Sequence, residues 1–135
     1  MTRDIRYALI GLGNIGRNLL DIIIHRQEAI AADYGLRFVL VGAADSSGAA
    51  LSADGLDGAD IRDSKQAGLG VAGISGVGRP GMTALEMLES AGAELLVDAS
   101  PTNLQTGEPG LSCQRWALEH GLHVVAANKG PLVLH

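Results

Sequence analysis

The sequence predicts a doubly wound α/β fold, in which helices cover both faces of a parallel sheet. Short apolar runs alternate with segments of helical periodicity along the chain. A glycine-rich turn joins the first apolar run to the first helix, and the other polar motifs also follow apolar runs directly. The length of 135 residues fits one domain, residues 1–135, that is large enough to bury a core.

The first third of the chain has the pattern of one strand–helix–strand unit. Residues 5–10 form a mostly apolar run that ends at Gly11, as expected for a strand covered on both faces. Residues 15–30 carry apolar side chains at helical spacing, and Gly35 is placed to cap that helix. Residues 38–44 form a second buried strand, which the helical crossover makes parallel to the first.

Residues 46–82 are the least regular part of the sequence, because glycines interrupt every longer period. We expect a short helix over residues 59–67 and loop elsewhere. The sequence leaves open whether this segment is a disordered surface insertion or an ordered functional loop.

The last part of the chain is regular again. A Thr-x-x-Glu capping box at residues 83–86 predicts a helix that stops near Gly92, and residues 94–98 form a third strand. Residues 109–121 begin with proline and end with glycine, which predicts another helix. Residues 123–127 complete the pattern as a fourth strand.

The amino-acid composition indicates the compartment in which the protein acts and the classes of partner that it excludes. The chain has 10 Lys+Arg, 15 Asp+Glu and a net charge of −5, which argues against a nucleic-acid partner. Cys113 is the only cysteine, so an intrachain disulfide is impossible and a reducing cytoplasm is the expected location. No apolar run approaches the ~20 residues of a membrane span.

No metal site is expected. The histidines make no ligand set, and Cys113 is placed to be a small packed side chain on a helix. The four histidines are His25, His120, His123 and His135.

The first motif with chemical meaning is G-L-G-N-I-G at residues 11–16. In this pattern Gly11 permits a tight turn, Gly13 lets a pyrophosphate approach the backbone, and Gly16 lets the helix pack closely on the strand. The amides and the dipole at the helix N-terminus then attract phosphate charge. A strand before the motif and a long amphipathic helix after it favour a dinucleotide site over a glycine turn without a ligand.

Asp45 is the second candidate, at the end of the second strand. Its carboxylate can accept hydrogen bonds from the adenosine ribose and would repel the extra phosphate of NADP, so we expect a preference for NAD. A solvated aspartate at a strand end is the alternative. Ser46 and Ser47, and the basic Arg62 and Lys65, could still accept a phosphate.

Two further motifs follow the third and fourth strands. Ser100 and Pro101 belong to a turn that we expect near the nicotinamide ribose, although these residue types favour turns in any case. Lys129 follows the last strand at the same edge of the sheet, where its ammonium could stabilise charge that develops on a substrate oxygen. Position alone is also compatible with a solvated lysine.

Together these motifs resemble the nucleotide-binding part of homoserine dehydrogenase, a Rossmann-type domain. The resemblance is carried by residues 11–16, by D-A-S-P-T-N at 98–103 and, most specifically, by V-A-A-N-K-G-P at 125–131. V-G-A-A-D-S-S at 41–47 also looks like the family's second strand end. The similarity covers nearly the whole chain and is weakest over residues 48–82.

The resemblance implies reduction of L-aspartate 4-semialdehyde to L-homoserine with NADH or NADPH, on the route to threonine and methionine. Lys129 matches the family's lysine between cofactor and substrate. The expected cofactor-binding residues are Gly11, Gly13, Asn14, Ile15, Gly16, Asp45, Ser46, Ser100, Pro101 and Lys129.

The family also has a second domain, which binds the substrate, supplies another catalytic lysine and forms the dimer. The chain stops shortly after Lys129, so we expect one part of a larger homodimeric enzyme, inactive alone. One alternative is another NAD(P)-dependent reductase of an aspartate-derived aldehyde or imine. Another is a stand-alone nucleotide-sensing module, in which a functional Lys129 would have no purpose.

Overall fold

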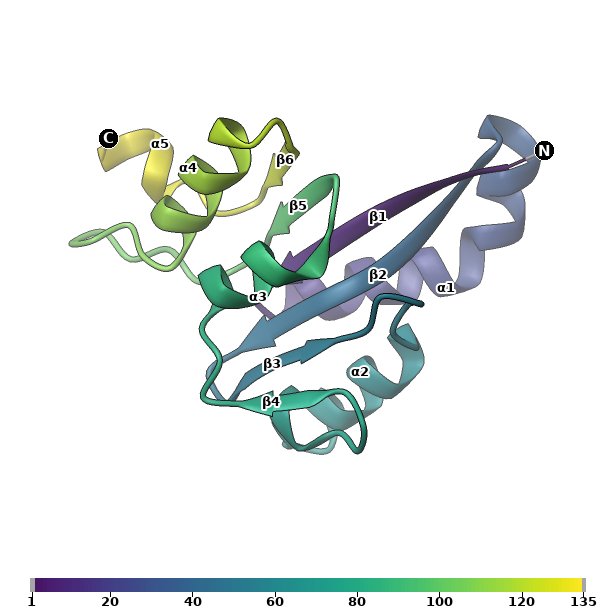
Figure 1. Ribbon diagram of the computed structural model, residues 1–135, viewed down its shortest axis with the longest axis horizontal. Coiled ribbons are helices and arrows are strands. Elements are labelled where there is room, and N and C mark those ends of the chain that lie inside the picture. Colours follow the sequence, from purple (N-terminus) through teal and green to yellow (C-terminus); the bar gives the residue numbers. More distant parts are fainter. Residues whose placement is uncertain (1, 135) are drawn as a thin grey trace.

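A six-stranded sheet lies between two layers of helices in the computed structural model, which describes residues 2–134 (Figure 1). The strands are β1 (Arg3–Ile10), β2 (Leu36–Asp45), β3 (Gly48–Leu51), β4 (Gly78–Pro80), β5 (Leu95–Asp98) and β6 (His123–Ala126). The helices are α1 (Asn14–Tyr34), α2 (Gly58–Gln66), α3 (Ala84–Ala91), α4 (Gly110–Glu119) and α5 (Gly130–Leu134), with a 3-10 turn, η1 (Val71–Gly73).

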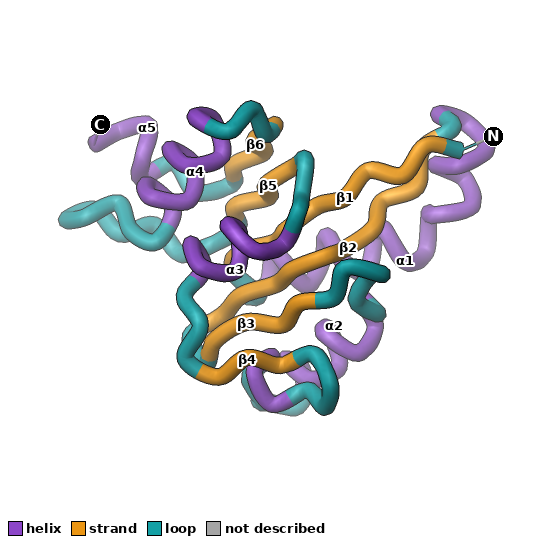
Figure 2. Tube along the Cα trace, in the orientation of Figure 1, coloured by secondary structure: helices purple, strands orange, loops and turns teal. Residues whose placement is uncertain are grey.

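The order of the strands places β1 at the centre of the fold. The sheet reads β4-β3-β2-β1-β5-β6, and β2, β1, β5 and β6 pair in parallel, as the sequence predicts. The chain passes from β1 to β2 on one side and later returns to β5 on the other side of β1. Such a reversal opens a crevice at the carboxyl ends of the strands. These strands run from right to left in Figure 2, so the crevice lies to the left.

Each face of the sheet has its own core, because successive residues of a strand point to opposite faces. Ala8 and Ile10 pack with the buried residues of α3 and α4. Tyr7 and Leu9 pack on the other face with those of α1 and α2. Figure 1 shows α3 and α4 in front of the sheet and α1 and α2 behind it, which confirms the predicted helices on both faces.

The expectation of loop for most of residues 46–82 is wrong. β3 pairs antiparallel with β2 across the turn at Asp45–Gly48, and β4 pairs antiparallel with β3. Only the predicted short helix is confirmed, as α2. Because β3 reads Gly-Ala-Ala-Leu, it lacks the β-branched and aromatic residues that mark strands in a sequence. It forms because Ala49 and Ala50, both 0% exposed, fit between the two helical layers.

The predicted helix ends are confirmed at the caps. Gly35 takes the left-handed conformation at φ 66°, and its amide donates to the carbonyl of Ala31 at 3.0 Å. Thr83 and Glu86 form the reciprocal capping box at the start of α3. Pro109 occupies the cap of α4 and not its first turn.

No helix between residues 2 and 134 is both long enough and apolar enough to cross a membrane.

Candidate functional site

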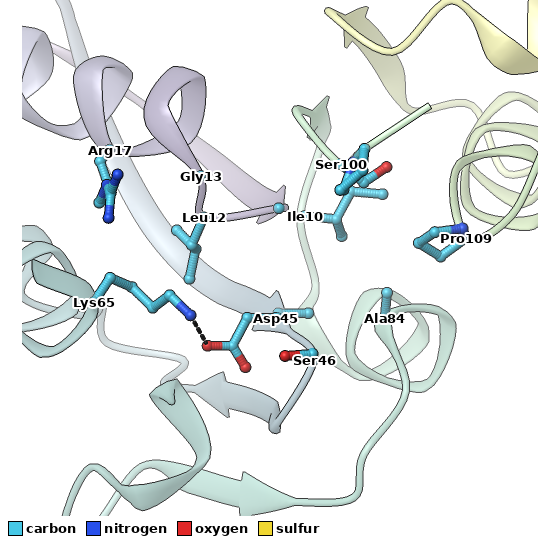
Figure 3. Close-up of a pocket in the computed structure, with 13 residues that line it drawn as sticks. Ile10, Leu12, Gly13, Arg17, Asp45, Ser46, Lys65, Ala84, Ser100 and Pro109 are labelled. Atoms are coloured by element: carbon cyan, nitrogen blue, oxygen red, sulfur yellow. Dashed lines mark hydrogen bonds and ion pairs between the residues drawn. The ribbon is translucent and has the colours of Figure 1, made fainter. Parts of the chain in front are cut away.

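A cavity of about 570 Å³ opens at the carboxyl ends of β1, β2 and β5, in the crevice that the strand order creates (Figure 3). The lining comes from several elements and comprises Ile10, Gly11, Leu12, Gly13, Arg17, Ala44, Asp45, Ser46, Lys65, Ala84, Ser100, Pro101 and Pro109. Of the residues expected to bind a cofactor, Gly11, Gly13, Asp45, Ser46, Ser100 and Pro101 therefore meet at one cavity.

The three glycines of the first turn have different structural roles. Gly11 has φ +88°, and a side chain there would collide with the backbone of Ala99 after β5. A side chain at Gly16 would collide with the carbonyl of Gly11. Gly13 has ordinary extended dihedrals, and a Cβ there would meet nothing within 4 Å. The fold thus requires Gly11 and Gly16, whereas the open space at Gly13 is available to a ligand.

The start of α1 offers its amides to that space. Gly13 caps the helix without a side-chain hydrogen bond, and the first turn holds no acidic residue. Free amides and the helix dipole there favour an anion. Asn14, Ile15 and Gly16 follow in this first turn but are outside the cavity lining, and the Ile15 side chain is 60% exposed.

Asp45 lies at the far end of the cavity, and protein donors surround its carboxylate. Its Oδ1 accepts from the amide and the hydroxyl of Ser47, at 2.8 and 2.6 Å. Its Oδ2 accepts from Nζ of Lys65 at 2.9 Å and from the amide of Val71 at 3.0 Å. The side chain is 5% exposed, so the alternative of a solvated aspartate is wrong.

Burial acts to raise the pKa of Asp45, but the hydrogen bonds from Ser47, Lys65 and Val71 outweigh it, so the pKa lies below its ordinary value of 3.8. A carboxyl group with a lowered pKa in the folded state adds stability above its unfolded pKa, and this stability is lost as the pH falls through the folded value.

We therefore expect Asp45→Asn to destabilise the protein at pH 7 and at pH 5, and expect the difference from wild type to shrink below about pH 4. Urea unfolding from pH 7 to pH 3 measures it, with Asp54→Asn at an exposed position as the control for removal of one charge. A difference that stays constant down to pH 3 would contradict the role of these hydrogen bonds.

Two basic side chains line the cavity near its Asp45 end. Figure 3 shows Arg17 and Lys65 on one side of the glycine turn, with Ser100 and Pro109 on the other. Nη2 of Arg17 donates to Oδ1 of Asn14 at 2.7 Å, three residues back on the same helix. Arg17 is not among the residues predicted from the sequence, although its place one turn into the helix after the glycine motif marks it as a candidate.

Arg62, the other basic candidate, does not line this cavity. Its guanidinium pairs with Asp21 at 2.8 Å and with Asp63 at 3.0 Å. These carboxylates occupy Arg62, which leaves Lys65 as the basic residue beside Asp45.

A buried polar network stands behind the other end of the cavity. Asp98, at the end of β5 and 0% exposed, accepts from the amide and hydroxyl of Ser100 and from Nε2 of Gln114 at 2.7 Å. Nδ2 of Asn128 donates to Oγ of Ser100 at 3.0 Å, and its Oδ1 accepts from the amide of Gly130 at 3.0 Å. The turn after β5 and the turn after β6 are thereby held in one geometry.

Lys129 lies between two residues of this network. Asn128 and Gly130 are buried, while the Lys129 side chain is exposed and does not line the cavity. The fixed neighbours hold its backbone at the carboxyl edge of the sheet, beside the Ser100 turn.

The described residues contain no group of three metal-ligating side chains. Cys113 is 0% exposed, as expected, and burial together with the nearby Asp98 carboxylate raises the pKa of its thiol to about 12. His120 stacks on Trp116 with ring centroids 4.1 Å apart, and His135 lies outside the described residues.

Comparison with known proteins identifies similar enzymes. No protein-family model matches the chain. The NAD(+)-dependent homoserine dehydrogenase of Pseudomonas canavaninivorans is 33% identical over 133 residues, which are 98% of this chain and 38% of that enzyme. The homoserine dehydrogenase of Methanocaldococcus jannaschii is 31% identical over 126 residues, 93% of this chain and 37% of that enzyme.

Solved structures give the same result for the fold. The homoserine dehydrogenase of Thermoplasma acidophilum matches with a TM-score of 0.74 and 31% identity, over 96% of this chain and 37% of that one. A hyperthermophilic archaeal homoserine dehydrogenase in complex with NADPH has a TM-score of 0.79 at 21% identity, over 98% of this chain and 38% of that one, and shows the shared fold. The chain spans between a third and two fifths of the length of these relatives.

Proposed function

Homoserine dehydrogenases are homologues of this chain over nearly its whole length, and on that premise we propose that residues 1–135 form the NAD(P)-binding domain of such an enzyme. The reaction is the reduction of L-aspartate 4-semialdehyde to L-homoserine. The observation that carries the proposal is the cavity, which joins the open amides at Gly13 to Asp45 on one side and to Ser100 on the other.

The residues present fit an extended dinucleotide. The adenosine ribose belongs at the end of β2, beside Asp45 and Ser46, and the pyrophosphate belongs at the start of α1. The nicotinamide end then lies toward Ser100, Pro101 and Pro109. In this arrangement Asn14 and Ile15 offer backbone amides of the first helical turn, and Gly11 and Gly16 keep that turn in shape.

We assign a catalytic role to Lys129. The bound cofactor supplies the hydride, and negative charge develops on the aldehyde oxygen as the hydride reaches the carbonyl carbon. An ammonium within hydrogen-bond reach stabilises this charge. The Asn128 and Gly130 contacts fix the backbone on both sides of Lys129, so the side chain needs to order only its own rotamers.

Titration calorimetry of the chain with NAD tests the proposal. We expect a saturable heat of binding with one site per chain, and a higher melting temperature in millimolar NAD. ADP-ribose, which lacks the nicotinamide ring, should bind more weakly but at the same stoichiometry. Absence of both the heat and the thermal shift would overturn the proposal.

A preference for NAD over NADP is proposed for the same site. Asp45 keeps Lys65 as its partner, so the phosphate of NADP would have to compete with a carboxylate for this cation. Asp45→Asn frees Lys65, and we expect it to tighten NADP binding by roughly tenfold while weakening NAD binding.

The double variant Asp45→Asn/Lys65→Ala is the control for that prediction and should lose the gain for NADP. Calorimetric titration of each variant with both dinucleotides measures the ratio of affinities. Tighter binding of NADP by the unmodified chain would show that Lys65 or Arg17 dominates over Asp45.

The remaining expectations follow from the proposed enzyme. It would act in the cytoplasm on the route from aspartate to threonine and methionine, as a homodimer whose second domain binds the substrate. The buried reduced thiol of Cys113 is compatible with a reducing compartment.

A further inference from the structure

The carboxylate of Asp98 is a buried charge that the proposed reaction does not use. It is 0% exposed, and its three hydrogen-bond donors are the amide and hydroxyl of Ser100 and the side-chain amide of Gln114. All three are neutral groups. Within residues 2–134 no lysine, arginine or histidine forms an ion pair with Asp98, so its charge is solvated by dipoles without being neutralised.

The donors around Asp98 fit an ionised carboxylate. Oδ1 faces the Ser100 amide at 3.0 Å, and Oδ2 faces Nε2 of Gln114 at 2.7 Å; both nitrogens can only donate. Oγ of Ser100 accepts from Nδ2 of Asn128, so the proton of this hydroxyl points to Asp98 at 2.5 Å. No oxygen of the carboxylate is left facing an acceptor that would need a proton.

The space for this hydrogen-bond network depends on a glycine at the start of α4. A Cβ at Gly110, the first residue of α4, would collide with Oδ2 of Asp98 and with Nδ2 of Asn128. The glycine lets the helix backbone approach the carboxylate, which excludes water from it. A charge in such an environment acts over a longer distance than one at the surface, because fewer dipoles screen it.

One residue separates this charge from the cavity. Ser100 lines the cavity and holds Asp98 directly behind it, on the side where the nicotinamide belongs. The nicotinamide ring carries a positive charge when oxidised and none when reduced. We propose that Asp98 is a specificity-determining residue of this site. Its charge raises the affinity for NAD⁺ relative to the affinity for NADH, compared with an uncharged residue at position 98.

This inference rests on the proposed dinucleotide site and on the orientation of the cofactor in it. Lys129 follows Asn128, which bonds to the same Ser100 turn, so an ammonium that reached the site would act in the opposite direction on a cationic ring. The ratio of affinities for NAD⁺ and NADH therefore reports on both charges.

Asp98→Asn tests the proposal with an isosteric loss of charge. Gln114 can turn its amide so that its oxygen accepts from the new side chain, with the loss only of the long 3.5 Å bond from its Nε2 to the carbonyl of Asn128. We expect the affinity for NAD⁺ to fall about three- to tenfold relative to that for NADH. Asp33→Asn, which removes one charge at an exposed position of α1, should leave the ratio unchanged.

The exchange Asp98→Asn/Gln114→Glu returns a carboxylate to the network and should restore the ratio. It also keeps the proposal testable if the single variant is too unstable to purify, since the exchange retains the charge and one more hydrogen-bonded side chain. Lys129→Met should shift the ratio toward NAD⁺.

Calorimetric Kd values for NAD⁺ and NADH, with melting curves for each variant, complete the design. An unchanged ratio in Asp98→Asn overturns the role of Asp98. If that variant cannot be measured, a lowered ratio in Asp98→Asn/Gln114→Glu, which retains the charge, overturns it instead. If the unmodified chain binds neither NAD⁺, NADH nor ADP-ribose, the proposed function itself fails.

Discussion

Replacing Gly13 by alanine is expected to weaken NAD binding by at least tenfold while the fold survives. Its backbone dihedrals suit any residue, and a Cβ there would contact nothing within 4 Å in the free chain. The methyl group would instead occupy the space through which a pyrophosphate approaches the amides of α1. Loss of glycine at this cap costs the fold only about 1 kcal/mol.

Gly16→Ala should behave in the opposite way. Its Cβ would collide with the carbonyl of Gly11, and neither backbone segment can move without disturbing the strand behind it. Overpacking of this kind costs about 3 kcal/mol, a large part of the stability of a small domain. Urea unfolding and NAD titration of both variants separate the two effects.

Gly73→Ala is the matched control, since a Cβ there also meets nothing within 4 Å and the residue does not line the cavity. It should change the free energy of unfolding by no more than a few tenths of a kcal/mol and should leave the NAD affinity unchanged. Normal NAD binding by Gly13→Ala would show that the glycine turn does not take part in the binding site.

The second large effect is expected at Lys129. In an enzyme that joins this domain to a substrate domain, Lys129→Ala should lower turnover of the semialdehyde by about 10²–10³, with a much smaller change in dinucleotide affinity. Lys129→Arg should not recover the full rate, because a planar guanidinium does not replace a compact ammonium. Residues 1–135 alone should show no turnover whichever side chain occupies position 129.

Steady-state rates and cofactor titrations of the wild type and both variants measure this. Arg115→Ala, at an exposed position on α4, controls for the loss of a surface cation. Near-normal turnover in Lys129→Ala would identify this lysine as a solvated loop residue.

The sequence was most informative where a motif has a local physical cause. Gly11 and Gly16 are fixed by close backbone approach, and Gly35, Thr83 and Gly92 by helix ends, so the parallel strands and their helices could be predicted. The ends of these strands then placed Asp45 and Ser100 at one edge of the sheet.

The features that the sequence did not reveal depend on contacts between distant segments. β3 is held by pairing with β2, and β4 by pairing with β3. Neither strand carries the β-branched or aromatic residues that mark strands in a sequence. Gln114 looks like an ordinary helix residue until α4 brings it to Asp98. Likewise, the enclosure of Asp45 by Lys65 and Val71 requires α2 and η1 to fold back over the strand end.

The central claim is that the cavity at the carboxyl ends of β1, β2 and β5 binds a dinucleotide. Titration of the isotope-labelled chain with NAD, followed by amide NMR shifts, tests it most directly. A dinucleotide bound there should produce large shifts at Gly11, Gly13, Asp45 and Ser100, with little change at the second cavity of about 250 Å³ beside Tyr7 and Gly58. Shifts confined to that second cavity, or none at millimolar NAD, would contradict the account.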